Sequence, residues 1–100
     1  MSTLFTVSQS WFDHPSIYEN KVFAVGGDAI LLIQDGVLAL QSPIALASFT
    51  AKCLSNGIAV YALSDDCQLR GIESKCLDVE LVDYAGFVQL VSNHQKQLAW

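Results

Sequence analysis

Charged side chains are scarce in this sequence, and basic ones are the scarcest. Asp, Glu, Lys and Arg make up 15% of the residues, against 52% apolar residues, whereas a typical soluble domain has about 25% charged residues. Ten acidic residues against five basic ones give a net charge of −5, and Arg70 is the single arginine. Because direct contact with a nucleic-acid backbone needs clustered basic side chains, we expect no direct binding of nucleic acid.

The sequence also lacks a long apolar run and an apparent secretion signal. The longest stretch without an acidic or basic residue covers 36–51 and is interrupted by Gln41, Ser42 and Pro43, so it falls short of the ~20 apolar residues that span a membrane. The first residues show no basic segment followed by an apolar one. We therefore expect a cytoplasmic protein that is not inserted in a membrane.

The apolar excess bears on both domain organisation and partners. A chain of 100 residues has room for one domain, which we expect to span residues 1–100. A domain of this size has a high ratio of surface to volume, and its few charged residues cannot cover that surface. Part of the exterior should therefore be apolar, which is typical of an interface with a partner protein.

The apolar pattern predicts strands alternating with helices. Strands are expected over 4–7, 29–33, 58–63, 79–82 and, at the edge, 97–100. Helices are expected over 15–25, 43–54, 64–70 and 84–93. The run 29–33 shows no alternation, which indicates a strand buried on both faces. This order predicts a single three-layer α/β domain with a mostly parallel sheet of four to five strands and helices on both faces.

Two of the expected helices show a marked pattern. The helix over 43–54 is apolar on all sides, with Lys52 as its single charged residue. Since a sheet covers one side only, we expect the outer side to contact a partner through Ile44, Leu46 and Phe49. The last helix should begin with Asp83 as its N-cap.

That last helix should carry one apolar face. The face consists of Tyr84, Phe87, Val88 and Val91.

The three cysteines are the strongest nucleophiles available, and they show no CxxC or Cys/His spacing. Cys53 falls in the last turn of a helix, where a thiolate is disfavoured, so we interpret it as a buried apolar residue. Cys67 falls in the first turn of the short helix, where the helix dipole lowers a thiol pKa and the neighbouring carboxylates of Asp65 and Asp66 oppose that shift. Cys76 lies in a loop-like stretch and is the best candidate for an exposed thiol.

The other polar candidates each have a structural interpretation that we favour. His14 and His94 are isolated residues at expected helix ends and match no metal-ligand spacing. Asp35 follows a parallel strand, where α/β sheets often bind ligands, but Asp35 with the following glycine also fits a simple turn.

Asp65 and Asp66 are interpreted as helix caps rather than an acid pair. Gly26 and Gly27 precede a strand instead of a helix, so they do not form a phosphate-binding loop. No metal or cofactor is expected.

Five segments, taken in order, resemble one known family. They cover 31–37 (LLIQDGV), 60–66 (VYALSDD), 70–72 (RGI), 82–90 (VDYAGFVQL) and 93–100 (NHQKQLAW). Together these segments resemble the TusB/DsrH family, the smallest subunits of bacterial sulfur-relay complexes. The resemblance extends over nearly the whole chain.

This resemblance implies a parallel α/β subunit that assembles with homologous TusC-like and TusD-like subunits as a dimer of heterotrimers. The complex would pass persulfide sulfur from TusA to TusE for 2-thiolation of the wobble uridine of tRNA, without direct contact between this chain and the RNA. Some DsrH-type members carry a cysteine late in the first helix. The corresponding region here, 17–22, has none, which indicates a structural subunit rather than a sulfur carrier.

Three alternatives stay open. The chain could be a DsrH-type subunit in dissimilatory sulfur oxidation. It could carry sulfur on Cys76 or Cys67. It could also be an independent module that binds a small molecule near Asp35.

Overall fold

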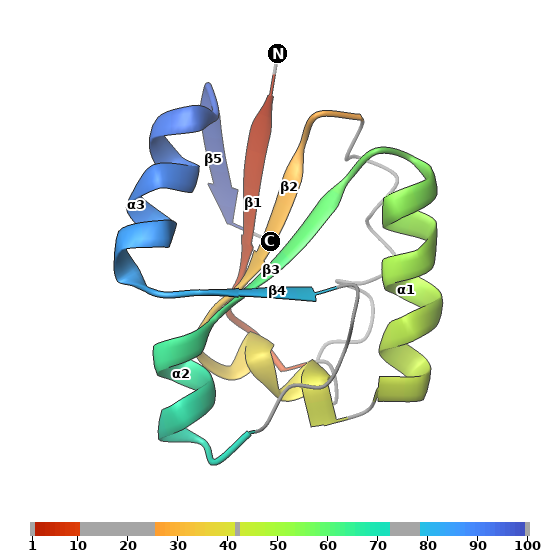
Figure 1. Ribbon diagram of the computed structural model, residues 1–100, viewed down its shortest axis with the longest axis vertical. Coiled ribbons are helices and arrows are strands. Elements are labelled where there is room, and N and C mark those ends of the chain that lie inside the picture. The colour runs from red at the N-terminus through yellow and green to blue at the C-terminus, as the bar shows by residue number, and fades with distance from the viewer. Residues whose placement is uncertain (1, 11–25, 42, 73–78, 100) are drawn as a thin grey trace.

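The computed structural model describes residues 2–10, 26–41, 43–72 and 79–99 (Figure 1). The described strands are β1 (Thr3–Val7), β2 (Ala29–Leu32), β3 (Ala59–Leu63), β4 (Val79–Val82) and β5 (Lys96–Ala99). The described helices are the 3-10 helix η2 (Gln34–Gln41), α1 (Pro43–Ser55), α2 (Ser64–Leu69) and α3 (Tyr84–Asn93). The expected helix over 15–25, together with His14, lies outside the described residues.

The five strands form one parallel sheet in the order β4-β3-β2-β1-β5. Its register places Leu4 beside Ala29 and Ala29 beside Ala59, so alternate residues of neighbouring strands share a face. β5 lies beside β1 at one edge of the sheet. The predicted α/β fold, with a parallel sheet and a C-terminal edge strand, is confirmed.

Helices cover both faces of this sheet, with α1 and α3 on opposite sides (Figure 1). On one face, Phe5, Ile30 and Val60 pack in a cluster with Phe49 and Cys53 of α1. This cluster also receives buried residues from η2 and α2. All four residues of β2 are buried, as the absence of alternation predicted.

The opposite face has a smaller core. Leu4, Ala29 and Leu31 form its buried centre, and Phe87 and Leu90 of α3 pack against them from outside. The two faces therefore differ in how many described helical elements cover them. One receives α1, η2 and α2, and the other receives α3.

One prediction about a helix face is wrong. Phe49 was expected on the outer side of α1, but its side chain is 5% exposed and lies in the core. The side chains of Ile44 and Leu46 lie outside the described residues. On the apolar face predicted for α3, Tyr84 and Val88 are 61% and 62% exposed.

The physical reason is the rotation of each helix about its own axis, which decides which of its side chains face the sheet. α1 directs Phe49 and Cys53 to the sheet, and Ala51, Lys52 and Leu54 are exposed. α3 directs only Phe87 and Leu90 to the sheet.

Gly36 allows η2 to begin immediately after β2. A Cβ at this position would overlap the carbonyl oxygen of Val7 and come within 2.9 Å of the Val7 carbonyl carbon. The segment is held by two backbone bonds, from the Ile33 N–H to the Val7 oxygen at 2.9 Å and from the Gly36 N–H to the Ile33 oxygen at 2.8 Å. The sequence pattern predicted a break here but not this 3-10 helix.

No helix in the described part of the chain is both long and apolar enough to cross a membrane. Gly27, which precedes β2, has a φ of 92° in a turn, and its N–H donates to the Gly57 oxygen at 3.1 Å. The helix expected before this turn is not among the described residues.

Candidate functional site

Cys67 lies in α2, directly after the carboxyl end of β3, where ligand sites of parallel sheets often form. Its side chain is 2% exposed and belongs to the core. Burial raises the pKa of the Cys67 thiol, the Asp66 carboxylate raises it further, and the Arg70 guanidinium lowers it in part. Since the thiolate is the nucleophilic form, this environment holds Cys67 as an inert neutral thiol.

Of the other two cysteines, the structure describes only Cys53. Cys53 is 1% exposed and packs in the core beside the sheet, as expected for a buried apolar residue. Cys76 lies outside the described residues. Both cysteines that the structure describes are therefore buried, and the environment of Cys67 in addition disfavours its thiolate.

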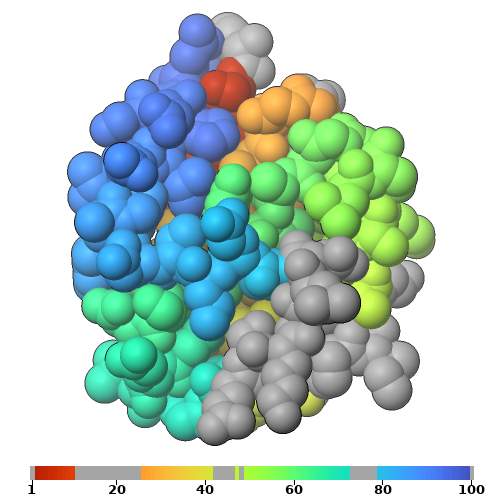
Figure 2. Space-filling view, viewed as in Figure 1, coloured from red at the N-terminus to blue at the C-terminus, as the bar shows by residue number. Residues whose placement is uncertain are grey.

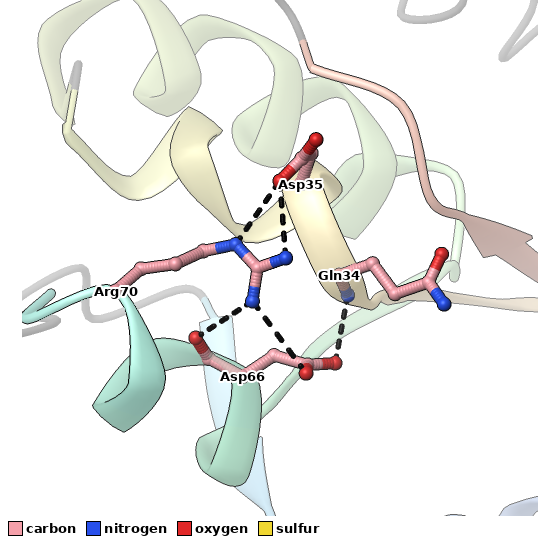
Figure 3. A network of polar contacts seen from close by, with 4 residues as sticks. All are labelled: Gln34, Asp35, Asp66 and Arg70. Carbon is pink, nitrogen blue, oxygen red and sulfur yellow. Dashed lines mark hydrogen bonds and ion pairs between the residues drawn. The ribbon is translucent and has the colours of Figure 1, made fainter.

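Three charged side chains meet at the carboxyl edge of the sheet (Figure 3). The Arg70 guanidinium donates from Nε and Nη2 to Oδ1 of Asp35, at 3.1 and 3.0 Å. Its Nη1 lies 3.6 Å from Oδ1 of Asp66. The other oxygen of Asp66 accepts from the Gln34 N–H at 2.7 Å. These contacts tie η2 to α2, which follow neighbouring strands.

This cluster corrects the predicted role of the acidic pair. No side chain caps the start of α2. Asp66 instead holds the backbone of Gln34, whose φ of 49° is unusual for a residue other than glycine. Asp35 is engaged by Arg70 although its side chain is 63% exposed. The polar groups near Asp35 thus bind one another, which favours a structural contact over a small-molecule site.

His94 and Asp83 also have local partners. His94 ends α3, as expected, and its Nδ1 lies 2.7 Å from the Leu90 oxygen. Asp83 caps α3 as predicted, since its Oδ1 accepts from the Gly86 N–H at 2.8 Å. The described residues contain no group of three or more His, Cys, Asp or Glu side chains able to hold a metal ion.

An apolar surface on α3 is the feature that sequence reasoning missed. A groove of about 220 Å³ is lined by Tyr84, Phe87, Val88, Val91 and Ser92. The periodicity of the apolar residues identified this face correctly, but it did not indicate that the face is exposed. The low charge content was the signal that some apolar face had to remain outside.

Comparison with known proteins gives close matches over most of the chain. The family described as "DsrH like protein" matches residues 10–97. A relative from Photorhabdus laumondii, named Protein TusB, is 39% identical over 98 residues, covering 97% of this chain and 99% of the relative. A Protein TusB from Pectobacterium parmentieri is 40% identical over 75 residues, covering 74% of this chain and 76% of the relative.

Solved structures agree on the fold. A Thermotoga maritima protein determined by solution NMR superposes with a TM-score of 0.65 at 31% identity, covering 90% of this chain and 91% of that one. A conserved protein of unknown function from Bacteroides thetaiotaomicron has a TM-score of 0.68 at 17% identity, covering 98% and 94%, and this likeness concerns the fold alone. Since the family match and the Photorhabdus TusB relative both extend over nearly the whole sequence, the chain belongs to the DsrH-like family and is a homologue of TusB proteins.

Proposed function

We propose that this chain is a structural subunit of a cytoplasmic sulfur-relay complex that supports 2-thiolation of the wobble uridine of tRNA. Its partners would be homologous TusC-like and TusD-like subunits in a dimer of heterotrimers, with TusA and TusE as indirect partners. The near full-length similarity to proteins named TusB is the observation that carries this proposal. The net charge of −5 supports a subunit that does not hold the RNA itself.

The structural rather than carrying role is supported by the cysteines. A sulfur carrier needs a thiolate that can reach the persulfide sulfur of a donor, take that sulfur, and release the donor as a thiolate. Cys53 and Cys67 are buried, and the pKa of Cys67 is raised. Cys76 is therefore the residue on which the carrier alternative now depends.

Mass spectrometry separates these two roles. The assembled complex is incubated with a persulfide donor, and a carrier cysteine in this chain would gain about 32 Da, one sulfur atom. We expect no such gain on this chain. Cys76→Ala serves as the test variant and Cys53→Ala as its matched control, with tRNA 2-thiouridine content measured in cells.

Both variants should restore 2-thiouridine to a strain that lacks this chain. Loss of thiolation with Cys76→Ala, in a complex that still assembles, would establish Cys76 as a carrier and overturn the structural role. A strain without this chain that retains full thiolation would overturn the assignment to tRNA modification, and would favour the sulfur-oxidation alternative.

A further inference from the structure

The outward side of α3 carries a row of apolar side chains that nothing in the described structure covers. Tyr84, Val88 and Val91 lie at positions i, i+4 and i+7, which places them on one side of a helix. They are 61%, 62% and 38% exposed. We call these three residues the outer row. Figure 2 shows α3 at the surface of the molecule, beside β4 and α2.

The whole helix is unusual for a surface element. None of its ten residues, YAGFVQLVSN, is acidic or basic, and none is buried. Phe87 and Leu90 on its inner side already contact the sheet. A helix with apolar side chains on both its inner and outer sides is typical of an element placed between a core and a second contact.

The charges around α3 indicate what kind of partner the outer row fits. Glu80 is exposed on β4 and shares a sheet face with Tyr61, which packs on the α3 side of the sheet. Asp83 is exposed at the start of the helix. The lysines and the arginine that the structure describes do not lie beside the outer row.

Lys52 is in α1, on the other side of the sheet, and Arg70 is paired with two carboxylates. Lys96 is paired with Thr3 in the sheet, so the two side chains share a face. Leu4 faces α3, and successive residues of a strand alternate between faces. Thr3 and Lys96 therefore lie on the face opposite α3. His94 at the end of α3 contacts the Leu90 oxygen. Among the described residues, the α3 side is therefore apolar at its centre with acidic groups beside it.

Charge complementarity with the acidic groups beside the outer row indicates which kind of polypeptide binds there. Pairing two copies of this chain through α3 would bring acidic groups together, in molecules that each carry a net charge of −5. A different polypeptide with an apolar contact flanked by Lys or Arg would face the opposite charge.

We propose that the outer row of α3 is the docking surface for such a basic-flanked apolar segment of a partner subunit. The identity of that partner, a TusC-like or TusD-like subunit, rests on the proposed function. Tyr84 is the anchor, because large aromatic side chains at the centre of an interface contribute most of its binding energy.

Co-purification and binding kinetics with the TusC-like and TusD-like proteins of the same organism test this surface. Val88→Asp places a carboxylate in the outer row. Leu54→Asp is the matched control, since Leu54 is 50% exposed on α1, on the other side of the sheet. Tyr84→Ala shortens the anchor without adding charge. Circular dichroism and thermal melting establish that each variant is folded, and Tyr84→Ala decides the result if Val88→Asp does not fold.

We expect Val88→Asp and Tyr84→Ala to weaken binding about tenfold or more, as truncation of an interface anchor does, while Leu54→Asp binds like the wild type. Wild-type affinity for both α3 variants, or loss of binding with Leu54→Asp alone, would overturn the docking surface and leave the proposed function standing. Failure of the wild-type chain to bind either partner would instead overturn the proposed function, and this inference with it.

Two further measurements test the charge argument. Glu80→Lys should slow association with the partner, because an acidic group that steers a basic one acts mainly on the association rate. Faster association would show that the partner's flank is acidic. Sedimentation compares the isolated wild-type chain with the isolated Val88→Asp variant, and we expect no dimer that depends on α3. A wild-type dimer that Val88→Asp abolishes would identify a second copy as the occupant and overturn the proposal.

Discussion

Replacing Gly36 by alanine tests the close approach of η2 to the end of β1. Gly36 does not have a positive φ, so alanine can adopt its backbone conformation, and the cost comes from the added methyl group alone. That group would overlap the Val7 carbonyl oxygen and lie 2.9 Å from the Val7 carbonyl carbon. Because the obstacle is backbone, no side-chain rotation relieves it, and η2 must move away from β1.

The size of the effect follows from this geometry. Forcing an extra carbon into a packed site typically costs about 1–3 kcal/mol, and a clash with backbone belongs at the upper end. Moving η2 also strains the Gly36 to Ile33 hydrogen bond of 2.8 Å. We therefore expect Gly36→Ala to lower the free energy of unfolding by about 3 kcal/mol, which corresponds to a fall in Tm of roughly 12–24 °C for a domain of this size.

Gly71→Ala is the matched control. Gly71 has a φ of 64°, and an added Cβ would meet nothing within 4 Å. Its cost is backbone strain alone, about 1–2 kcal/mol. Thermal unfolding followed by circular dichroism compares the two variants in one buffer. A Gly36→Ala protein that melts no lower than Gly71→Ala would refute the claim that contact with Val7 requires glycine.

Smaller effects are expected at the polar contacts. Asp83→Ala should lower the free energy of unfolding in urea by about 1 kcal/mol through loss of the α3 cap, and Asp83→Asn should retain most of it. A double-mutant cycle of Asp35→Asn and Arg70→Gln should give a coupling below about 1 kcal/mol, because the pair is partly exposed; a coupling of about 3 kcal/mol would contradict this. Burial and Asp66 raise the pKa of Cys67 above its ordinary 9.0, so its stabilising contribution is full below about pH 9 and falls as pH rises through the folded-state pKa. Urea denaturation should show that Cys67→Ala lacks this alkaline loss, and an unchanged pH dependence would refute it.

The strands were predictable because their signal is local. The unbroken apolar run 29–33 predicted a strand buried on both faces, and β2 is buried throughout. Asp83 predicted the start of α3, and its carboxylate caps that helix. Each of these predictions depends on a few neighbouring residues and on no knowledge of what packs against them.

The Asp35–Arg70 contact was not predictable in the same way. The two residues are 35 positions apart, and no sequence motif links them. A partial signal existed, because Asp35 and Asp66 each follow a strand, and parallel neighbours end at the same edge of a sheet. Strand order was the missing information. Once β2 and β3 are neighbours, Arg70, one turn after Asp66, comes within reach of Asp35.

The placement of the apolar exterior shows why composition and periodicity stop short of a surface. Both α1 and α3 have mostly apolar sequences, and the sequence alone favoured α1 as the exposed helix. In the structure, α1 shares its side of the sheet with η2 and α2, and Phe49 is enclosed among them. α3 is the one described helix on the other side, so of its apolar side chains only Phe87 and Leu90 pack against the core. How many elements share a face decides which apolar residues stay outside, and that number is a property of topology rather than of any single helix.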